Sequence, residues 1–251
     1  MDTETQTYLY ELLLDQIPKP PKNKTIWSNS PTRLGACIVE FREHPYMEAV
    51  LNNMCNVYGG TKVVLYIVHG IDNEQYIKRI VDKWDNVKLI KMDLHNIDIA
   101  TYSTMLTSYD FYCNFKTEFI LFFQTDSLIR KQIPDLFFEY KYVGAPWVGY
   151  PNDYPNNPHI RIGNKLVGNG GFSLRNVEKM KDICKNNTFT NIAEDVFITN
   201  HLLDSDIPTV AIANQFSVEM IPHDDPVGMH QIWKFIPFQK VKQLLKPIID
   251  Q

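Results

Sequence analysis

Residues 119–130, FILFFQTDSLIR, change from apolar to polar at their midpoint. Phe119 to Phe123 carry only aromatic and aliphatic side chains, which is typical of a strand buried on both faces of a parallel sheet. The next four residues, QTDS, put the carboxylate of Asp126 just beyond the carboxyl end of this strand. Ligands of α/β proteins bind at that end of the sheet, so Asp126 is a candidate metal ligand. Asp and Ser are also ordinary turn residues, so a turn that caps the next element is the alternative.

The length and composition limit the classes to which the chain can belong. Its 251 residues suit one α/β domain with a sizeable core, or at most two small ones. The formal charge of −4, with both signs interspersed, predicts no basic face and makes nucleic acid an unexpected partner. Aromatic residues make up 12% of the chain and several stand in expected loops, where such residues often line pockets for ring-shaped ligands.

Cysteine usage and the N-terminal segment predict a soluble, cytoplasmic protein. The four cysteines form no CxxC pair and no zinc-binding spacing, so free thiols in a reducing compartment are expected. The segment MDTETQTYLYELLLDQ is acidic, and its apolar stretch is too short for a signal peptide or a membrane anchor. We expect no transmembrane segment elsewhere. The many Asn, Ile and Lys residues are typical of AT-rich genomes, including those of large DNA viruses.

The chain is predicted to have a short N-terminal element and one main domain. Residues 1–21 are expected to form an amphipathic helix over 4–17 and a stiff linker, because the IPKPP run cannot continue a helix. Residues 33–250 are expected to form the main domain. Its first half alternates strands and helices, as in the βαβ units of a parallel sheet. The expected strands are Ala36–Val39, Lys62–Val68 and Asn86–Met92, and the expected helices are His44–Tyr58, Glu74–Trp84 and Ala100–Tyr112.

The second half of the main domain is less regular. Its segment PWVGYPNDYPNNPH, residues 146–159, has four prolines, and a loop of this length in a compact domain is usually functional or disordered. The elements expected around this loop are strands at Tyr142–Gly144, Gly171–Leu174 and Thr209–Ala213 and helices at Asn191–Leu203 and Phe238–Leu245.

Three further stretches carry more polar residues than packing requires. In VGNGGFSLR, residues 167–175, the glycines let the backbone approach a ligand, although Asn-Gly is also a strong hairpin signal. In NIAEDVFITNHLL, residues 191–203, two acidic residues begin a helix. One of them could project into a cleft as a general base. Alternatively, both are there because the helix dipole favours acidic residues in the first turn. The segment PHDDPVGMHQIW, residues 222–233, contains two histidines. A single histidine is more often structural than a metal ligand. An imidazole that meets a carboxylate from a distant part of the chain is nevertheless a recurrent way to complete a metal site.

A strand-end Asp, a glycine-rich turn, a Glu-Asp helix start and a late His, in this chain order, resemble the GT-A glycosyltransferases. The resemblance is close to a subgroup known mainly from sequence and of uncharacterised function, and it runs from Ile38 to Trp233. Its marks here are IVEFREHP, HGIDN, FQTDSLI, YVGAPW, GNGGFSLR, EDVF and GMHQIW. It implies a single-domain α/β fold of the GT-A, Rossmann-like type, with a mixed, mostly parallel sheet flanked by helices. It also implies transfer of a sugar from a UDP- or GDP-type nucleotide-sugar to a hydroxyl of a glycan, protein or small-molecule acceptor.

By the same resemblance, the strand end corresponds to the Asp-x-Asp motif that binds a divalent cation and the donor diphosphate. Gln124 stands at the first position and Asp126 at the last, so one of the two carboxylates is replaced by an amide. His230 matches the late histidine that many of these enzymes use as a further metal ligand. The implied cofactor is Mn²⁺ or Mg²⁺, which would neutralise the charge that builds on the leaving diphosphate.

The resemblance also implies catalytic and acceptor-binding residues. Asp195, with Glu194 as second choice, matches the base of inverting members, which takes the proton of the acceptor hydroxyl. Trp147 and Trp233 would stack on pyranose rings on the acceptor side, where residues 147–159 would form a mobile wall. Further residues implied to bind the nucleotide or donor are Glu40, Arg42, His69, Asn73, Gln124, Gly170 and Gly171.

Two other classes of function fit parts of this pattern. A non-catalytic module that binds a nucleotide or sugar on a GT-A scaffold is favoured by Gln124, where an acid is expected. It is opposed by the presence of the strand-end Asp, the Glu-Asp pair and the late His together. A nucleotidyltransferase would share the sheet and the metal, but the chain has neither a Gly-rich first loop bearing Arg or Lys nor a second strand-end pair of carboxylates.

Overall fold

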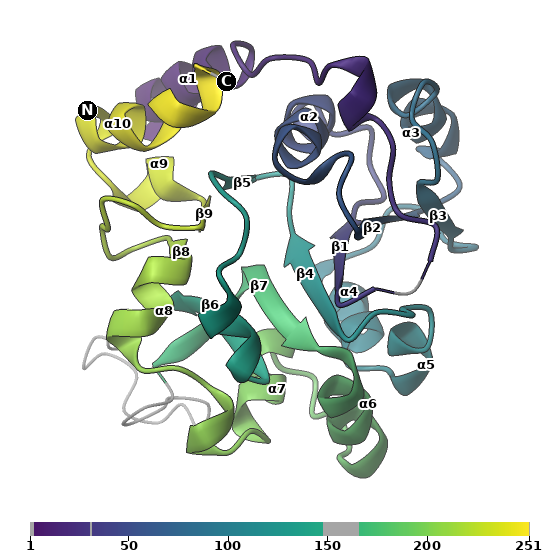
Figure 1. The fold of residues 1–251 in the computed structure, drawn as a ribbon. Helices are drawn as coiled ribbons and strands as arrows, with labels where there is room; N and C mark the ends of the chain where they lie inside the picture. The colour runs from purple at the N-terminus through teal and green to yellow at the C-terminus, as the bar shows by residue number, and fades with distance from the viewer. Residues whose placement is uncertain (1–2, 31, 148–165, 251) are drawn as a thin grey trace.

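The computed structural model describes residues 3–30, 32–147 and 166–250, and a six-stranded sheet lies at its centre (Figure 1). The strands are β1 (Leu34–Val39), β2 (Val63–His69), β3 (Lys88–Lys91), β4 (Phe119–Phe123), β6 (Tyr142–Pro146) and β7 (Val167–Asn176). Their order is β3-β2-β1-β4-β7-β6. The first four run parallel, whereas β7 is antiparallel to both β4 and β6. This mixed, mostly parallel sheet flanked by helices confirms the expected α/β fold class.

Alternate residues of the central strands face two separate apolar layers. Ile38, Leu65 and Leu121 pack against α2 (Met47–Tyr58) and α3 (Glu74–Ile80). Their neighbours in sequence, among them Cys37 and Phe122, face the layer that contains α4 (Ile99–Leu106), α5 (Tyr109–Tyr112), α6 (Val177–Asn186) and α7 (Glu194–Asn200). Because both faces are covered, all five residues of β4 are buried, as the run FILFF predicts.

A second, three-stranded sheet continues from the end of β4. It consists of β5 (Ser127–Ile129), β9 (Gly228–His230) and β8 (Ser217–Val218), with β9 in the middle. Ser127 and His230 are directly opposite each other in the antiparallel β5–β9 pair. This pairing, which the sequence analysis did not predict, brings the late histidine beside the residue that follows Asp126.

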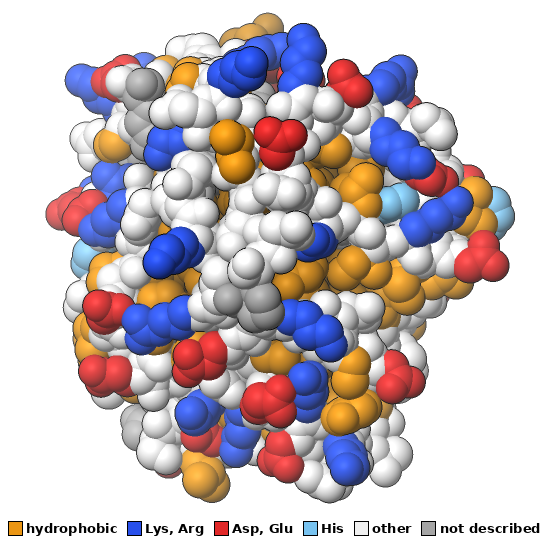
Figure 2. Space-filling model, turned by 45° about the vertical axis from the view of Figure 1, so that its right-hand side comes forward, with side chains coloured by type: hydrophobic (Ala, Val, Ile, Leu, Met, Phe, Trp, Pro, Cys, Tyr) orange, Lys and Arg blue, Asp and Glu red, His pale blue; other side chains and the backbone are white. Residues whose placement is uncertain are grey.

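The N-terminal helix packs onto the C-terminal part of the chain. The expected helix over 4–17 is observed as α1 (Thr3–Leu14), which contacts α9 (Ile232–Phe235) and α10 (Phe238–Ile249) (Figure 1). The ring of Tyr10 stacks on Trp233 with centroids 4.0 Å apart. No helix among the described residues is both long and apolar enough to cross a membrane. On the face drawn in Figure 2, acidic and basic side chains are intermixed, in line with the charge pattern of the sequence.

The structure corrects three of the expected elements. The strand predicted at Thr209–Ala213 is wrong, because this segment begins α8 (Val210–Phe216), whose buried residues Ala213 and Phe216 are three apart on one helical face. The helix predicted at Ala100–Tyr112 is two helices, since the backbone of Ser108 is extended. The helix predicted at Glu74–Trp84 already ends at Ile80. Residues 148–159 of the expected mobile wall lie outside the described residues.

Replacing Tyr10 by Ala tests the docking of α1. Tyr10 is 1% exposed, whereas Tyr8 on the same helix is 59% exposed. We expect Tyr10→Ala to lower the free energy of unfolding by about 3–5 kcal/mol, because it leaves a cavity where a large ring was buried. Tyr8→Ala is the matched control and should change it by less than about 0.5 kcal/mol. Urea unfolding measures both, and equal effects would contradict the docking.

Candidate functional site

A cavity of about 440 Å³ lies at the carboxyl ends of β1 and β4. The loop before α4 and the start of that helix form one wall, and the start of α7 forms another. Six of the residues proposed from the sequence line this single cavity, although they are far apart in the chain: Glu40, Arg42, Gln124, Asp126, Glu194 and Asp195. The topology therefore brings together the first-strand loop, the strand-end QTDS segment and the Glu-Asp helix start.

The loop after β1 presents an arginine that is fixed by a buried glutamate. The carboxylate of Glu40 accepts hydrogen bonds from the backbone N–H groups of Phe41 and Arg42 and from the Arg42 guanidinium. Asn73 supports this loop from behind, since its Nδ2 donates to the carbonyls of Glu40 and Arg42 at 2.8 and 3.1 Å. His69 Nδ1 lies 2.9 Å from the Gly70 carbonyl. His69 and Asn73 are therefore buried beneath the loop and do not line the cavity.

At the end of β4, one imidazole lies between two carboxylates. His230 Nε2 is 3.3 Å from Asp126 Oδ1, and His230 Nδ1 is 3.3 Å from Glu219 Oε1. These distances are those of ion pairs, but the angles are not those of hydrogen bonds, so both ring nitrogens and Asp126 Oδ1 are buried without a hydrogen-bond partner. Asp126 is held through its other oxygen, which accepts from Gln231 Nε2 at 2.7 Å.

Charge and burial act in opposite directions on this cluster. Burial raises the pKa of Asp126, but the neighbouring His230 outweighs it and holds the pKa below its usual value. Burial also lowers the pKa of His230, yet the contacts with Asp126 and Glu219 more than offset this and raise the pKa to about 9. In the structure, the imidazole is therefore a cation that balances two buried carboxylates.

The two acids at the start of α7 have different environments. Glu194 Oε1 accepts a hydrogen bond of 2.8 Å from Arg175, whose side chain is fully buried. The carboxylate of Asp195 instead accepts from the backbone N–H groups of Gly170, at 3.0 Å, and Val196, at 2.8 Å. Burial, followed by the charge of Glu194, raises the pKa of Asp195 to about 7. A carboxylate with a pKa near neutrality suits proton transfer, so the arrangement favours Asp195 over Glu194 as a base.

The glycines of VGNGGFSLR belong to β7 and do not form the hairpin turn that was the alternative. Their role is to admit close neighbours. A Cβ on Gly170 would lie 2.5 Å from Glu194 Oε1, and a Cβ on Gly171 would lie 2.3 Å from the His230 ring. The lack of side chains thus lets the α7 carboxylates and the imidazole pack directly against consecutive residues of one strand.

The two tryptophans proposed for the acceptor side lie outside the cavity lining. Trp147 is half-buried. Its ring packs close to Gly168, where a Cβ would contact both this ring and Thr199 of α7. Trp233 is only 4% exposed and stacks on Tyr10 in the core. Packing of α1 over this ring is the physical reason that Trp233 is not available to a sugar in this structure.

A divalent cation fits the strand-end cluster only with ligands from elsewhere. The described part of the chain contains no group of three His, Cys, Asp or Glu side chains placed to bind a metal. It does contain two candidate ligand atoms, Asp126 Oδ1 and His230 Nε2, which form an ion pair with each other, so the imidazole would have to release its proton before Nε2 could bind a metal. The carboxylate of Glu219 on the opposite ring nitrogen matches the second-shell arrangement of metal-binding histidines. These residues fit a hard cation such as Mn²⁺ or Mg²⁺ if a ligand supplies further oxygens.

The sequence analysis missed two residues that shape this site. Arg175 is the single charge in the buried strand segment GFSLR, and Glu219 stands in the apolar stretch FSVEMIP. A lone charged residue within an apolar run is a signal for a buried ion pair, and both residues form one.

Comparison with known proteins finds one sequence family and several solved structures. A family model described as "Protein of unknown function (DUF5672)" matches residues 86–230, more than half of the chain. Among solved structures, residues 1–349 of S. aureus TarS align with a TM-score of 0.50 and 12% identity over 79% of this chain and 60% of TarS. A mannosyltransferase from Pyrobaculum calidifontis, solved in complex with GDP-Man and Mn²⁺, aligns at a TM-score of 0.43 and 16% identity over 77% of this chain and 58% of its own.

The TarS match shows the fold alone, because the identity is low and this chain spans about 60% of the TarS chain. No curated protein matches the sequence.

Replacing Gly171 by Ala tests the contact between β7 and His230. We expect a loss of about 1–3 kcal/mol in the free energy of unfolding, because the new methyl group would overlap the imidazole. In the His230→Ala background the same substitution should cost clearly less, since the ring is gone. Urea unfolding of the four proteins measures this coupling, and an equal cost in both backgrounds would refute the contact.

Proposed function

The chain belongs to the DUF5672 family, described as proteins of unknown function, and we propose that it is a glycosyltransferase. In this proposal it moves a sugar from a nucleotide-sugar to an acceptor hydroxyl, with the help of a divalent cation and with inversion at the anomeric carbon. One observation carries the proposal: a single cavity at the carboxyl ends of β1 and β4 contains Arg42, Asp126 and Asp195 together. In this proposal Arg42 is the guanidinium that meets the diphosphate, Asp126 is the metal ligand and Asp195 is the base.

The donor, of the UDP or GDP type, occupies the side of the cavity formed by the first-strand loop and the end of β4. A volume of about 440 Å³ is within the usual range for small-molecule sites. The Arg42 guanidinium is held in place by Glu40, which also balances its charge, and its remaining N–H groups can donate hydrogen bonds to a diphosphate. Gln124, whose Nε2 donates to the Tyr102 hydroxyl at 3.3 Å, contributes an amide instead of the expected acid.

The cation, Mn²⁺ or Mg²⁺, would be held by Asp126 and His230, with the remaining oxygens from the diphosphate. It would neutralise negative charge on the leaving diphosphate. Glu219 is the ion-pair partner of the other imidazole nitrogen, Nδ1, and so favours the ring orientation with Nε2 toward Asp126.

Asp195 takes the proton of the acceptor hydroxyl while that oxygen attacks the anomeric carbon from the face opposite the leaving diphosphate. Two backbone N–H groups fix its carboxylate, so it needs no reorientation during the reaction. Glu194 is bound to the buried Arg175 and therefore serves to position the start of α7 rather than to accept the proton.

A non-catalytic module that binds a nucleotide or sugar is the second candidate, and Gln124 in place of an acid favours it. The raised pKa of Asp195 favours the enzyme, because a binding site has no need of a carboxylate poised near neutrality. Slow release of nucleoside diphosphate from a nucleotide-sugar in water would separate the two, since an active enzyme usually leaks donor to water.

Replacing Asp126 by Asn tests the metal-assisted part of the proposal. We expect chelation of divalent cations to weaken binding of UDP or GDP to the wild-type protein, because the diphosphate shares the cation with Asp126. In Asp126→Asn, chelation should have no further effect. Isothermal titration calorimetry with and without Mn²⁺ measures the affinities. Equal affinity with and without the cation in the wild-type protein would remove the metal from the proposal.

Replacing Asp195 by Asn tests the catalytic step. Asparagine has nearly the same shape but accepts no proton, so turnover should fall on the order of 100- to 10,000-fold while nucleotide affinity barely changes. The wild-type kcat should rise as the pH passes through about 7, because only the ionised form of Asp195 is a base. Donor hydrolysis, or transfer if an acceptor is found, provides the assay.

Asp182→Asn on α6 is the matched control for this experiment, since Asp182 is exposed and does not line the cavity. It should turn over normally. Normal turnover in Asp195→Asn as well would exclude Asp195 as the base, and would shift the role to Glu194 or favour a retaining mechanism without a protein base.

A further inference from the structure

In the proposed function, the transferred sugar lies between the metal side and the base side of the active-site cavity. The diphosphate is bound near Asp126, and Asp195 takes the proton of the attacking oxygen. The anomeric carbon, which carries the sugar ring, therefore lies between these two side chains. Lining residues between the end of β4 and the start of α7 are the expected contacts of the sugar.

Two uncharged side chains of this lining are hydrogen-bonded to each other. Tyr102 of α4 and Gln124 at the end of β4 both line the cavity and are half-buried. Gln124 Nε2 donates to the Tyr102 hydroxyl at 3.3 Å. Burial, followed by the charge of Glu194 at the start of α7, raises the pKa of Tyr102. The phenol thus keeps its proton, and its hydroxyl lies within electrostatic range of both β4 and α7 groups.

The Tyr102–Gln124 pair presents one hydrogen-bond donor and one acceptor side by side. The Tyr102 oxygen accepts from the amide, so its own hydrogen is available to donate. Among the described residues, neither this hydrogen nor Gln124 Oε1 has a hydrogen-bond partner. Neighbouring hydroxyls of a sugar ring match the pair, since each can donate or accept. Because the two side chains are already bound to each other, one ring can reach both.

The charges around this pair disfavour an acidic sugar. Carboxylates of Asp98, Glu194 and Asp195 line the cavity on the side of α4 and α7. Arg42 is the only basic side chain among the described residues of the lining, and it is paired with Glu40 in the first-strand loop. The carboxylate of a uronic or sialic acid would therefore lose water here without gaining a free cation, which is unfavourable.

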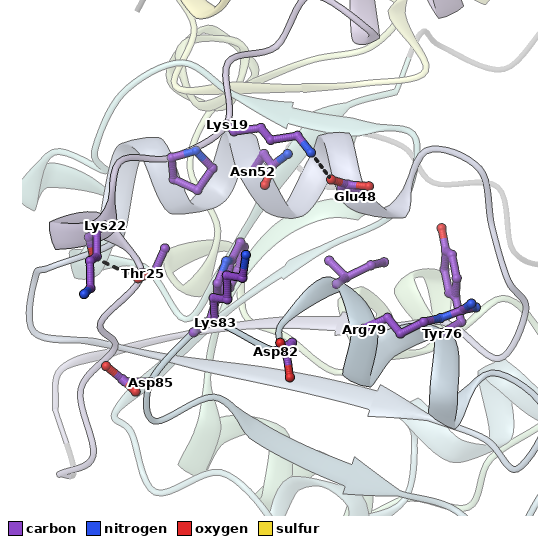
Figure 3. Close-up of a pocket in the computed structure, with 13 residues that line it drawn as sticks. Lys19, Lys22, Thr25, Glu48, Asn52, Tyr76, Arg79, Asp82, Lys83 and Asp85 are labelled. Carbon is purple, nitrogen blue, oxygen red and sulfur yellow. Dashed lines mark hydrogen bonds and ion pairs between the residues drawn. The ribbon is translucent and has the colours of Figure 1, made fainter.

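The larger cavity of the molecule offers no comparable pair. It is a groove of about 1020 Å³ between α2, α3 and the linker that follows α1. Figure 3 shows Lys19 paired with Glu48 across this groove, and Lys22, Lys83 and Asp85 are exposed charges at its lining. In its described lining, no two uncharged side chains are hydrogen-bonded to each other. The features that suit a neutral sugar therefore lie in the cavity at the end of β4.

We propose, resting on the glycosyl transfer proposed above, that the transferred sugar is an uncharged hexose whose neighbouring hydroxyls bind Tyr102 and Gln124. The Tyr102 hydroxyl donates to one sugar oxygen, and the adjacent sugar hydroxyl donates to Gln124 Oε1. Nucleotide-linked uronic and sialic acids are excluded by the carboxylates of Asp98 and Asp195.

Replacing Tyr102 by Phe tests the contact with the sugar. With Mn²⁺ present, the variant should bind UDP as the wild-type protein does, because UDP has no sugar to contact the hydroxyl. It should bind UDP-glucose about three- to tenfold more weakly, as expected for one lost hydrogen bond. Tyr109→Phe is the matched control, since Tyr109 is exposed and does not line the cavity. Calorimetry measures the affinities, and urea unfolding checks that each variant is folded. An equal loss for UDP and UDP-glucose, or no loss for either, overturns the contact.

Comparing UDP-glucose with UDP-glucuronate tests the sugar class, since the two differ only in the carboxylate at C6. The wild-type protein should bind the glucuronate about tenfold or more weakly, because no free cation meets the added charge. GDP-mannose and GDP-mannuronate are the equivalent probes if the protein prefers GDP. Equal or tighter binding of the acidic sugar overturns the neutral-sugar assignment while leaving glycosyl transfer intact. Binding of neither UDP nor GDP with Mn²⁺ would instead overturn the proposed function itself, and the sugar assignment with it.

Discussion

The buried ion pair between Arg175 and Glu194 determines where the second half of the site can lie. Arg175 is fully buried, and its guanidinium also donates to Tyr112 and Ser173 and lies over the ring of Phe122. A charge in such surroundings is tolerated only with a partner. The start of α7 must therefore stay where Glu194 reaches Arg175, and the next residue, Asp195, is held against β7. The interaction that neutralises one acid thus positions the other.

Strand β7 packs against both the α7 carboxylates and the imidazole that pairs with Asp126. Gly170 leaves space for the α7 carboxylates, and Gly171 leaves space for His230, which pairs with Asp126 at the end of β4. The proposed base and the proposed metal ligands are thus packed on neighbouring residues of one rigid strand. Side chains at these two positions would push the two parts away from the strand.

The sequence predicted the central strands well, because burial on both faces leaves a strong signal. Phe119–Phe123 was expected and found as a strand, and the acids of the Glu-Asp motif begin a helix as expected. Thr209–Ala213 was mistaken for a strand, since a helix with only two buried residues has a weak period. Trp233 was placed with the acceptor because the packing of α1 over it is a long-range contact. Glu219 was missed for a similar reason: only the β8–β9 pairing brings it to His230.

A crystal structure with a nucleoside diphosphate and Mn²⁺ tests the central claim most directly, since the metal can be located by its anomalous scattering. The account predicts one anomalous peak within coordination distance of Asp126 and His230, with the diphosphate between that peak and Arg42. It also predicts that the nucleotide leaves Asp195 free to face the sugar position. A nucleotide bound elsewhere on the protein, with the cavity at the end of β4 unoccupied, would contradict the account.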